Sequence, residues 1–309
     1  MRDLFTCNIK PFYKKHYGAA YLADSLDMLK CIKDNSINLI LTSPPFALTR
    51  KKEYGNKCSE EYVSWFFLFA REFKRILKYD GSLVIDLGGA YLPGYPIRSI
   101  YQYELLVKLC KELDLNLAQE FFHYNPSKLP APAEWVNIRR IRVKDSVNVV
   151  WWLSKSAFPK ADNRRVLKPY SKSMEQLLKN GYNPKLRPSG HDISDKFSKD
   201  NKGAIPPNLL DIANTESNSV YLRKCREADI KPHPARFPKD FALFFIKFLT
   251  EEKDIVLDPF AGSNTTGYAC EILRRRWIAI EINESYLEGS KYRFDTEYNL
   301  FDYMLRNNG

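Results

Sequence analysis

The chain has 309 residues, of which 44% are hydrophobic, and carries a formal net charge of +11 at pH 7 from 48 Lys and Arg against 37 Asp and Glu. This length and composition suffice to bury one large core, or one core and a smaller lobe. The basic charge, with 14% aromatic residues, favours a polyanionic partner, and nucleic acid before a membrane surface.

Several protein classes are disfavoured by what the sequence lacks. No stretch approaches the roughly 18 to 20 consecutive apolar residues of a membrane-spanning helix. The first residues do not form a signal peptide, so we expect a cytoplasmic protein. The six cysteines are scattered without a Cys-x-x-Cys pair, and the four histidines are equally dispersed. This spacing predicts reduced thiols and no metal site.

The first half of the chain alternates predicted strands and helices. Residues 1–18 have no clear period and predict an irregular arm. Apolar runs predict strands at 19–22, 37–41, 82–86, 117–124 and 147–152. Apolar residues at helical spacing predict a short helix after Ser25, a capped helix at 59–77 and a helix at 99–113. Tyr79-Asp80-Gly81 predicts a turn before the third strand.

The composition changes after Lys155. From there to Lys231 the chain is rich in Lys, Arg, Asn, Pro, Ser and Gly and has no sustained period, which is typical of a linker. Apolar and aromatic residues between Tyr170 and Tyr221 nevertheless give this segment something to bury. We therefore predict a smaller, loop-rich lobe at 155–231.

The alternation resumes beyond the lobe. A helix is predicted within 234–250, a strand at 255–258, a helix at 265–275, a strand at 277–281 and a last helix at 284–293. Nearly continuous apolar strands that alternate with helices predict a parallel sheet covered on both faces. We therefore expect an α/β fold in which 1–154 and 232–309 form one domain.

The stretch Ser43-Pro44-Pro45-Phe46 directly follows the predicted strand 37–41. Two prolines remove two backbone donors and hold φ at about −65°, so the chain leaves the sheet stiffly. The turn offers a ligand a hydroxyl, carbonyl oxygens without competing N–H groups and an aromatic face. That combination suits a flat ring with an amine, such as a nucleobase, although an ordinary Pro-Pro exit loop fits the same residues.

A second informative stretch begins at the predicted strand 255–258 and continues through Gly262 into a helix. A strand, a tight loop of small residues and a helix N-terminus aim backbone N–H groups at a ligand. Glu281 ends the next strand, about 20 residues after Gly262, where an acid accepts hydrogen bonds from ribose hydroxyls. The loop is neither a G-x-G-x-x-G fingerprint nor a P-loop. A glycine turn and a solvated Glu281 remain the alternative.

Together the two stretches resemble the amino-group DNA methyltransferases of the β group, in which the catalytic loop comes first, the cofactor loop last and a variable lobe between them. The resemblance to the cytosine-N4 members covers nearly the whole chain. It includes the segments 41–56, 86–91, 125–128, 134–137, 140–152, 187–210 and 233–238. It implies a Rossmann-like, mostly parallel methyltransferase sheet with permuted motif order, and a target-recognition lobe at 155–231. A serine at the head of the catalytic loop is typical of cytosine-N4 enzymes.

The resemblance also implies a catalytic role for the Ser-Pro-Pro-Phe loop. A cytosine amine is a poor nucleophile because its lone pair is delocalised into the ring. We expect Ser43 Oγ and the Pro44 carbonyl, beside Pro45, to accept its N–H bonds from a base flipped out of the duplex. Phe46 would stack on that base. Asp86, at a strand end, would receive the proton, unless it is only a helix cap or surface acid.

The implied cofactor is S-adenosyl-L-methionine. Asp24 would lie near its adenine, Glu281 on its ribose and His233 outside the pocket, although Asp24 also fits a helix cap and His233 a rigid turn. The full predicted set is Asp24, His233, Asp258, Phe260, Gly262, Ser263, Asn264, Thr265 and Glu281. Asn264 replaces a glycine of many relatives, and Asn tolerates left-handed backbone.

Double-stranded DNA is the implied partner. The predicted DNA-binding residues are Arg50, Lys51, Lys52, Arg187, His191 and Lys199, and phosphate contacts would make binding salt-dependent. The basic residues from Arg139 to Lys144 fit either DNA contacts or a charged edge strand. The resemblance implies the palindrome CAGCTG as target and a cognate restriction endonuclease that belongs to the same system without being a physical partner.

Three other functions compete with this interpretation. An adenine-N6 methyltransferase has the same fold, although its catalytic loop more often begins with Asp or Asn. A DNA-binding protein that has lost catalysis would not need Ser43, Asp86, Asp258 and Glu281 together. Methylation of RNA or protein would not need a large basic lobe.

Overall fold

The structure, a computed structural model, describes residues 2–47, 58–181, 199–214 and 219–295. It divides into two compact units, one formed by Met1–Ala161 with Asn208–Gly309 and the other by Asp162–Pro207. The second unit is shorter than the lobe predicted at 155–231, because β7 (Leu209–Asp211) pairs with β5 (Asn116–Tyr124) of the first unit. No helix in the described residues is long and apolar enough to cross a membrane.

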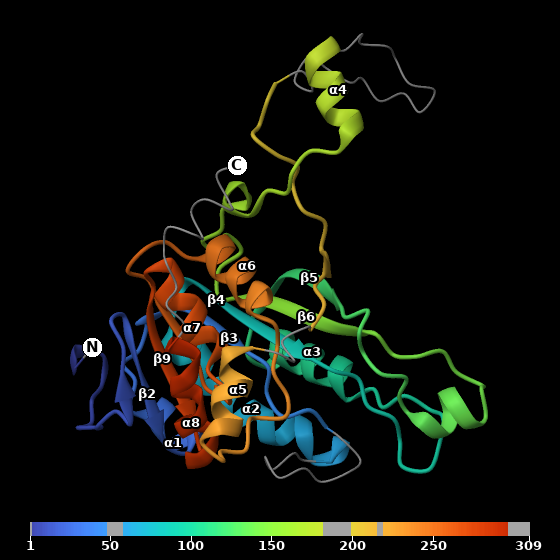
Figure 1. The fold of residues 1–309 in the computed structure, drawn as a ribbon. Coiled ribbons are helices and arrows are strands. Elements are labelled where there is room, and N and C mark those ends of the chain that lie inside the picture. Colours follow the sequence, from blue (N-terminus) through green and yellow to red (C-terminus); the bar gives the residue numbers. More distant parts are fainter. Residues whose placement is uncertain (1, 48–57, 182–198, 215–218, 296–309) are drawn as a thin grey trace. The chain divides into compact units, whose positions relative to one another are not determined.

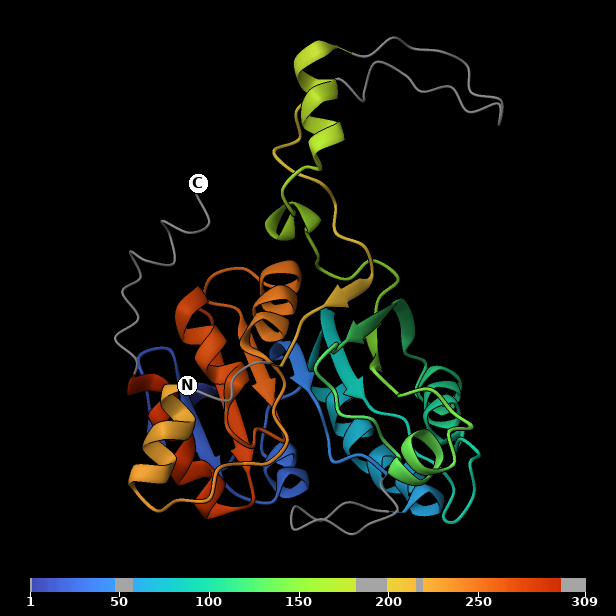
Figure 2. The same ribbon diagram turned by 45° about the vertical axis from the view of Figure 1, so that its right-hand side comes forward.

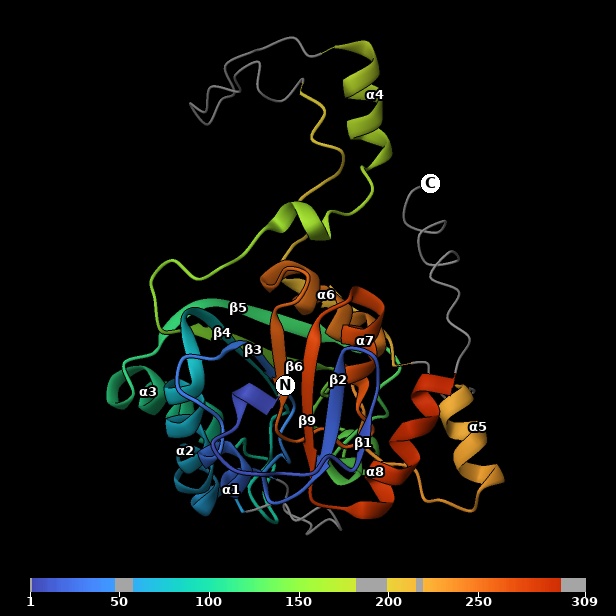
Figure 3. The ribbon, with the colours of Figure 1, turned by 90° about the vertical axis from the view of Figure 1, so that its left-hand side faces the viewer.

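The described part of the first unit contains a nine-stranded sheet in the order β1-β2-β9-β8-β3-β4-β6-β5-β7. The strands not yet given are β1 (Tyr13–Lys14), β2 (Gly18–Leu22), β3 (Ile37–Thr42), β4 (Leu77–Leu87), β6 (Val147–Ser154), β8 (Ile255–Asp258) and β9 (Arg276–Glu281). The pairs from β2 to β4 are parallel, whereas β6 is antiparallel to both β4 and β5. In Figure 3, β9 lies between β2 and β8, so the two ends of the chain interleave. The mostly parallel α/β fold is confirmed.

Helices cover both faces of this sheet. They are α1 (Ser25–Lys30), α2 (Ser59–Ile76), α3 (Tyr101–Glu112), α5 (Val220–Glu227), α6 (Lys239–Leu249), α7 (Thr265–Leu273) and α8 (Glu284–Ser290), with 3-10 turns η1 (Arg2–Leu4) and η6 (Lys291–Asp295). Along β3, Ile40 packs in the core with α1, α2 and α3, while Leu39 and Leu41 pack in the core with α6 and α7. Figures 1 and 3 show these two layers.

The predicted turn at Tyr79-Asp80-Gly81 is wrong, because these residues belong to β4. Leu77 pairs with Ile37 and Ser82 pairs with Leu39, so several residues of β4 oppose a single step of β3. The turn-forming residues are therefore absorbed as a bulge at the start of the strand. This lets β4 begin directly where α2 ends.

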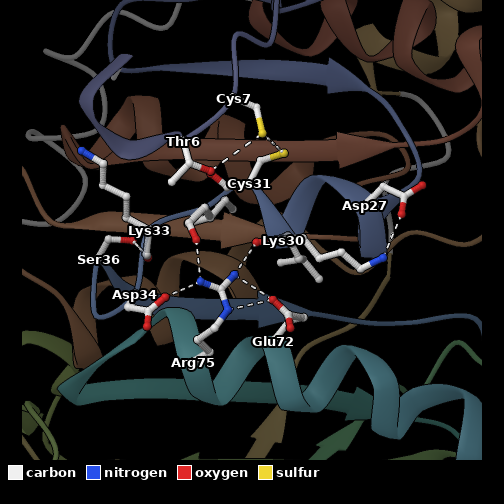
Figure 4. Close-up of polar contacts among 12 residues, drawn as sticks. Thr6, Cys7, Asp27, Lys30, Cys31, Lys33, Asp34, Ser36, Glu72 and Arg75 are labelled. Atoms are coloured by element: carbon white, nitrogen blue, oxygen red, sulfur yellow. Dashed lines mark hydrogen bonds and ion pairs between the residues drawn. The ribbon is translucent and has the colours of Figure 1, made fainter.

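Arg75 ties the end of α2 to the end of α1 (Figure 4). Its guanidinium donates to the carbonyls of Leu29 and Ile32, at 2.8 Å each, and pairs with Glu72 at 2.7 Å and with Asp34. A cation is favourable at the C-terminal end of a helix, where carbonyl groups lack partners within the helix. The contact holds α1 in place, and the N-terminal end of α1 carries Asp24.

The remaining differences from the predicted elements lie at segment ends and in connections. Part of the arm at 1–18 is ordered as η1 and β1, because β1 pairs with β2. Residues 139–144 form no edge strand; they lie in the exposed connection between β5 and β6, after the π-helix η2 (Glu134–Ile138). The other predicted strands and helices are confirmed within a few residues of their ends, with α6 beginning after Pro238.

In the second unit the structure describes residues 162–181 and 199–207. It contains η3 (Asn163–Val166) and α4 (Lys172–Asn180), seen in Figure 2, and a bridge between Lys168 and Ala204. The Ser171 hydroxyl caps α4 by accepting from Met174 N.

Candidate active site

A cavity of about 670 Å³ opens at the carboxyl ends of β3, β4, β8 and β9. This is the edge at which open α/β sheets bind their ligands. Most of the predicted catalytic and cofactor residues line it together. They are Asp24, Ser43, Pro44, Pro45, Phe46, Asp86, His233, Phe260, Gly262, Ser263, Thr265 and Glu281. Asp258 and Asn264 are absent from the lining.

The Ser-Pro-Pro-Phe turn leaves β3 immediately after Thr42. Ser43 Oγ donates a hydrogen bond of 3.1 Å to Asp86 Oδ2. The Phe46 ring lies against the backbone that follows β4, since a Cβ added to Gly88 would be 2.5 Å from that ring. Glycine at position 88 is therefore what allows the aromatic ring to reach the cavity wall beside Asp86.

Asp86 is a buried carboxyl, 3% exposed, near the end of β4. Besides Ser43, it accepts a hydrogen bond of 3.1 Å from Asn148 Nδ2. Burial raises the pKa of Asp86, and the hydrogen bonds and the nearby His123 and Lys128 only partly oppose this shift. A carboxyl with a raised pKa in a cavity is suited to holding a proton.

Three residues of this wall were missed as site residues in the sequence. Asn148 comes from β6, His123 from β5 and Lys128 from the turn after β5, and all three line the cavity. Their signal was faint, because only the family resemblance of 125–128 and 140–152 marked two of them. His123 Nε2 lies 3.1 Å from the Ile212 carbonyl, and its buried Nδ1 has no hydrogen-bond partner among the described residues.

Asp258 lies beneath the loop that follows β8, and its role as a cofactor-binding residue stays a prediction. Its carboxylate accepts from Thr42 Oγ1 at 3.0 Å, from Thr266 Oγ1 at 2.6 Å and from Phe260 N at 3.1 Å. Burial raises its pKa to about 6. Asp258 thus joins β3, the loop and α7, and shapes the site from below.

Glu281 connects the cofactor loop to the end of β9. Its two carboxylate oxygens accept from Gly262 N at 2.8 Å and from Asn283 N at 2.9 Å. Gly262 has a φ of 51°, and a Cβ there would lie 3.1 Å from the His233 ring. The backbone bonds leave the Glu281 carboxylate with acceptor capacity for a further donor. Burial raises the pKa of Glu281.

Asn264 supports the loop from below the cavity, and its place in the predicted cofactor set stays a prediction. It adopts left-handed backbone at φ 54° and caps α7, where Oδ1 accepts from Gly267 N at 3.0 Å. Its Nδ2 donates to the Tyr13 hydroxyl at 2.8 Å. Asn tolerates this conformation, as predicted.

Asp24 and His233, for which the sequence also fits a helix cap and a rigid turn, have these structural contacts and also line the cavity. Asp24 caps α1 by accepting from Leu26 N at 2.8 Å, and it also lines the cavity. His233 is held in a turn by the Ala235 carbonyl, and its ring packs over Gly262 as part of the wall. Burial lowers the pKa of His233 to about 4, so the ring is neutral near pH 7.

A family model described as DNA methylase matches residues 37–292. The chain belongs to this DNA methylase family. It is 52% identical over 295 residues to the type II methyltransferase M.PvuII of Proteus hauseri, covering 94% of this chain and 88% of that protein. The solved PvuII DNA methyltransferase (cytosine-N4-specific) superposes with a TM-score of 0.77 at 44% identity, covering 98% of this chain and 95% of that one. The M1.HpyAVI–SAM complex, at 19% identity and a TM-score of 0.51 over 90% of this chain and 100% of that one, shares the fold.

Aromatic side chains of the methylase form the floor between its two loops. Phe260 lies 5.1 Å from Phe69 and 5.8 Å from Trp65, measured between ring centroids. Trp65 and Phe69 come from α2 and also line the cavity, although neither is among the site residues predicted from the sequence. Arg293 supports the loop as well, donating to Ser263 Oγ at 2.9 Å.

The predicted DNA contacts of the methylase lie mostly outside the described residues. These are Arg50, Lys51, Lys52, Arg187 and His191. Lys199 is exposed in the second unit. Within the described residues, no group of three or more His, Cys, Asp or Glu could hold a metal ion.

Proposed function

We propose that this DNA methylase transfers the methyl group of S-adenosyl-L-methionine to the exocyclic N4 of a cytosine that is flipped out of duplex DNA. The observation that carries the proposal is the Ser43–Asp86 hydrogen bond in the same cavity as the Gly262–Glu281 loop. The similarity to a cytosine-N4-specific methyltransferase across nearly the whole chain supports it.

The direction of the Ser43 hydrogen bond prepares the hydroxyl to accept. Because Ser43 gives its only proton to Asp86, the lone pairs of its Oγ are left for an amine N–H. The Pro44 carbonyl is the second acceptor, and neither proline offers an N–H that would compete. An amine held by two acceptors becomes more tetrahedral, and its lone pair is directed at the methyl donor.

Asp86 is the group that would accept the proton released by the amine. Methyl transfer forms an N4–C bond and breaks the C–S bond, and the amine then loses one N–H proton to the carboxylate through the Ser43 hydroxyl. The raised pKa of Asp86 suits this task, because the buried carboxyl binds a proton more readily than a solvated one. Positioning of the amine relative to the methyl group supplies much of the acceleration.

The cofactor loop has the groups that S-adenosyl-L-methionine requires. Glu281 would accept from the ribose hydroxyls, Asp24 would lie near the adenine, and Gly262, Ser263 and Thr265 would surround the methionine part beside Phe260. The Glu281 carboxylate keeps acceptor capacity beside the cavity, and Gly262 itself adds no side chain next to it. When bound, the cofactor supplies an electrophilic sulfonium methyl group.

The biological setting is a type II restriction–modification system in the cytoplasm. The second unit and its neighbouring residues, 155–231, would recognise the target, with CAGCTG as the expected site. Arg50, Lys51, Lys52, Arg187, His191 and Lys199 would contact DNA. A cognate endonuclease would cut the same unmethylated site without binding the methylase.

Mass analysis of nucleosides tests this proposal. The protein is incubated with a CAGCTG duplex and methyl-labelled S-adenosyl-L-methionine, and the DNA is digested. We expect label in N4-methylcytosine. Label only in N6-methyladenine would establish the adenine-specific alternative, and DNA binding without any label would establish the catalytically silent one.

A further inference from the structure

A polar chain extends from Asp86 to a lysine on the opposite side of β6. Asn148 Nδ2 donates to Asp86 Oδ1 at 3.1 Å, and Lys128 Nζ donates to Asn148 Oδ1 at 3.3 Å. All three side chains line the cavity. The carboxylate and the ammonium therefore fix the orientation of the Asn148 amide, with its oxygen toward Lys128.

The turn that carries Lys128 is braced on both sides. Lys128 N donates to the Asn125 carbonyl at 3.2 Å, and Asn125 N donates to the Ser146 carbonyl at 2.9 Å. From the facing segment, Lys144 Nζ donates to the Pro126 carbonyl at 3.0 Å. Lys128 is half-buried and its turn is held by these hydrogen bonds, so its position is more restricted than that of a solvated surface lysine.

The Lys128 ammonium has donors to spare. It carries three N–H groups, and within the described residues only the bond to Asn148 is formed by them. The ammonium is near enough to Asp86 to lower the pKa of that carboxyl. Lys128 thus presents charged donors to the same cavity that Ser43 and Pro44 line.

Cytosine and adenine differ in the acceptors along their pairing edges. Along the pairing edge of cytosine the order is the N4 amine, the N3 acceptor and the O2 acceptor, whereas adenine has its amine, the N1 acceptor and a C–H group. Only a donor beyond the ring nitrogen distinguishes the two edges. We propose that Lys128, held by Asn148, donates to O2 of the flipped cytosine and selects cytosine over adenine. This inference rests on the proposed cytosine-N4 activity.

A double-mutant cycle, in which one change is made in the enzyme and the other in the substrate base, tests the contact between Lys128 and O2. One duplex carries the target cytosine, and the other carries a 2-aminopyridine C-nucleoside, which keeps the amine and the ring nitrogen but has C–H in place of C2=O. Rates are measured above the pKa of the aminopyridine ring, so that the ring nitrogen is unprotonated. The proteins are wild type, Lys128→Met, Lys128→Arg and the matched control Lys144→Met, whose lysine bonds only backbone carbonyls among the described residues.

We expect wild type to lose about tenfold to a hundredfold in kcat/KM on the analogue, the size of one charged hydrogen bond. Lys128→Met should lose a similar factor on cytosine and nothing further on the analogue. Lys128→Arg should keep the discrimination, and Lys144→Met should lower both rates by one common factor.

Two outcomes overturn the inference, and they are distinguishable. If wild type methylates cytosine but wild type and Lys128→Met lose the same factor on the analogue, Lys128 does not contact O2 and the proposed function stands. If wild type labels only adenine, the proposed function and this inference fail together. Thermal melting of each variant shows whether a lost rate reflects lost folding.

Discussion

Ser43 Oγ lies 3.1 Å from Asp86 Oδ2, at the carboxyl ends of the neighbouring parallel strands β3 and β4. The hydroxyl is oriented by a carboxyl that burial keeps ready to take a proton. One contact thereby joins the group that would hold the substrate amine to the group that would receive its proton.

Ser43→Ala removes the oriented acceptor. We expect kcat to fall by about 10²- to 10³-fold, as for the loss of one preorganised hydrogen-bonding group. The dissociation constant for S-adenosyl-L-methionine should stay within about twofold, because Ser43 belongs to the catalytic loop. Single-turnover methylation and calorimetric titration measure the two effects. An unchanged rate would rule out the proposed mechanism.

Gly88→Ala places a methyl group against the Phe46 ring. A Cβ 2.5 Å from that ring must displace it, and a misplacement of about 1 Å near the chemistry costs about 10²-fold in rate. The double variant Gly88→Ala, Phe46→Leu makes room for the methyl group. We expect Phe46→Leu to lower the single-turnover methylation rate less in the Gly88→Ala background than in wild type. Additive losses would show that the contact does not position Phe46.

Glu281→Gln exchanges one acceptor oxygen for an NH₂ group opposite Gly262 N or Asn283 N. We expect the dissociation constant for S-adenosyl-L-methionine to rise about tenfold to a hundredfold, with loss of a charged hydrogen bond. The control is Glu284→Gln, an exposed glutamate three residues further on. Equal affinities for the two variants would remove Glu281 from the cofactor site.

The raised pKa of Asp258 should make the free energy of unfolding depend on pH. Its pKa is about 6 in the folded protein, against 3.8 in an unfolded chain. Between these values the folded state binds more protons than the unfolded state, so this group makes stability fall as pH rises from about 4 to 6. His233, with its lowered pKa, acts in the opposite direction.

Comparing wild type with Asp258→Asn isolates the carboxyl from the other groups. We expect the free energy of unfolding of wild type to fall relative to that of the variant between about pH 4 and 6. Denaturant melts at several pH values provide the measurement. Parallel curves for the two proteins would show that Asp258 does not hold a raised pKa.

Local sequence features were enough to predict many of the strands, loops and helices. Some features depend only on residues adjacent in the sequence, and these were predicted correctly. They include the apolar runs of β3 and β8, the prolines after β3 and the glycine before α7. The turn predicted at 79–81 was wrong, because Leu77 pairs with Ile37 and residues 79–81 therefore belong to a strand. Residues 208–231 were grouped with the lobe, because the pairing of β7 with a distant strand leaves no local pattern.

By itself the sequence determined the strand–loop–helix units, the residues that end their strands and the resemblance to a family. Only the tertiary structure decided which of these residues meet. Ser43 and Asp86 are 43 positions apart, Asn148 and Asp86 are 62 apart, and Thr42 and Asp258 are 216 apart. Such contacts follow from the order β8-β3-β4-β6-β5 across the sheet, which brought Lys128 and Asn148 into the cavity and left Asp258 beneath it.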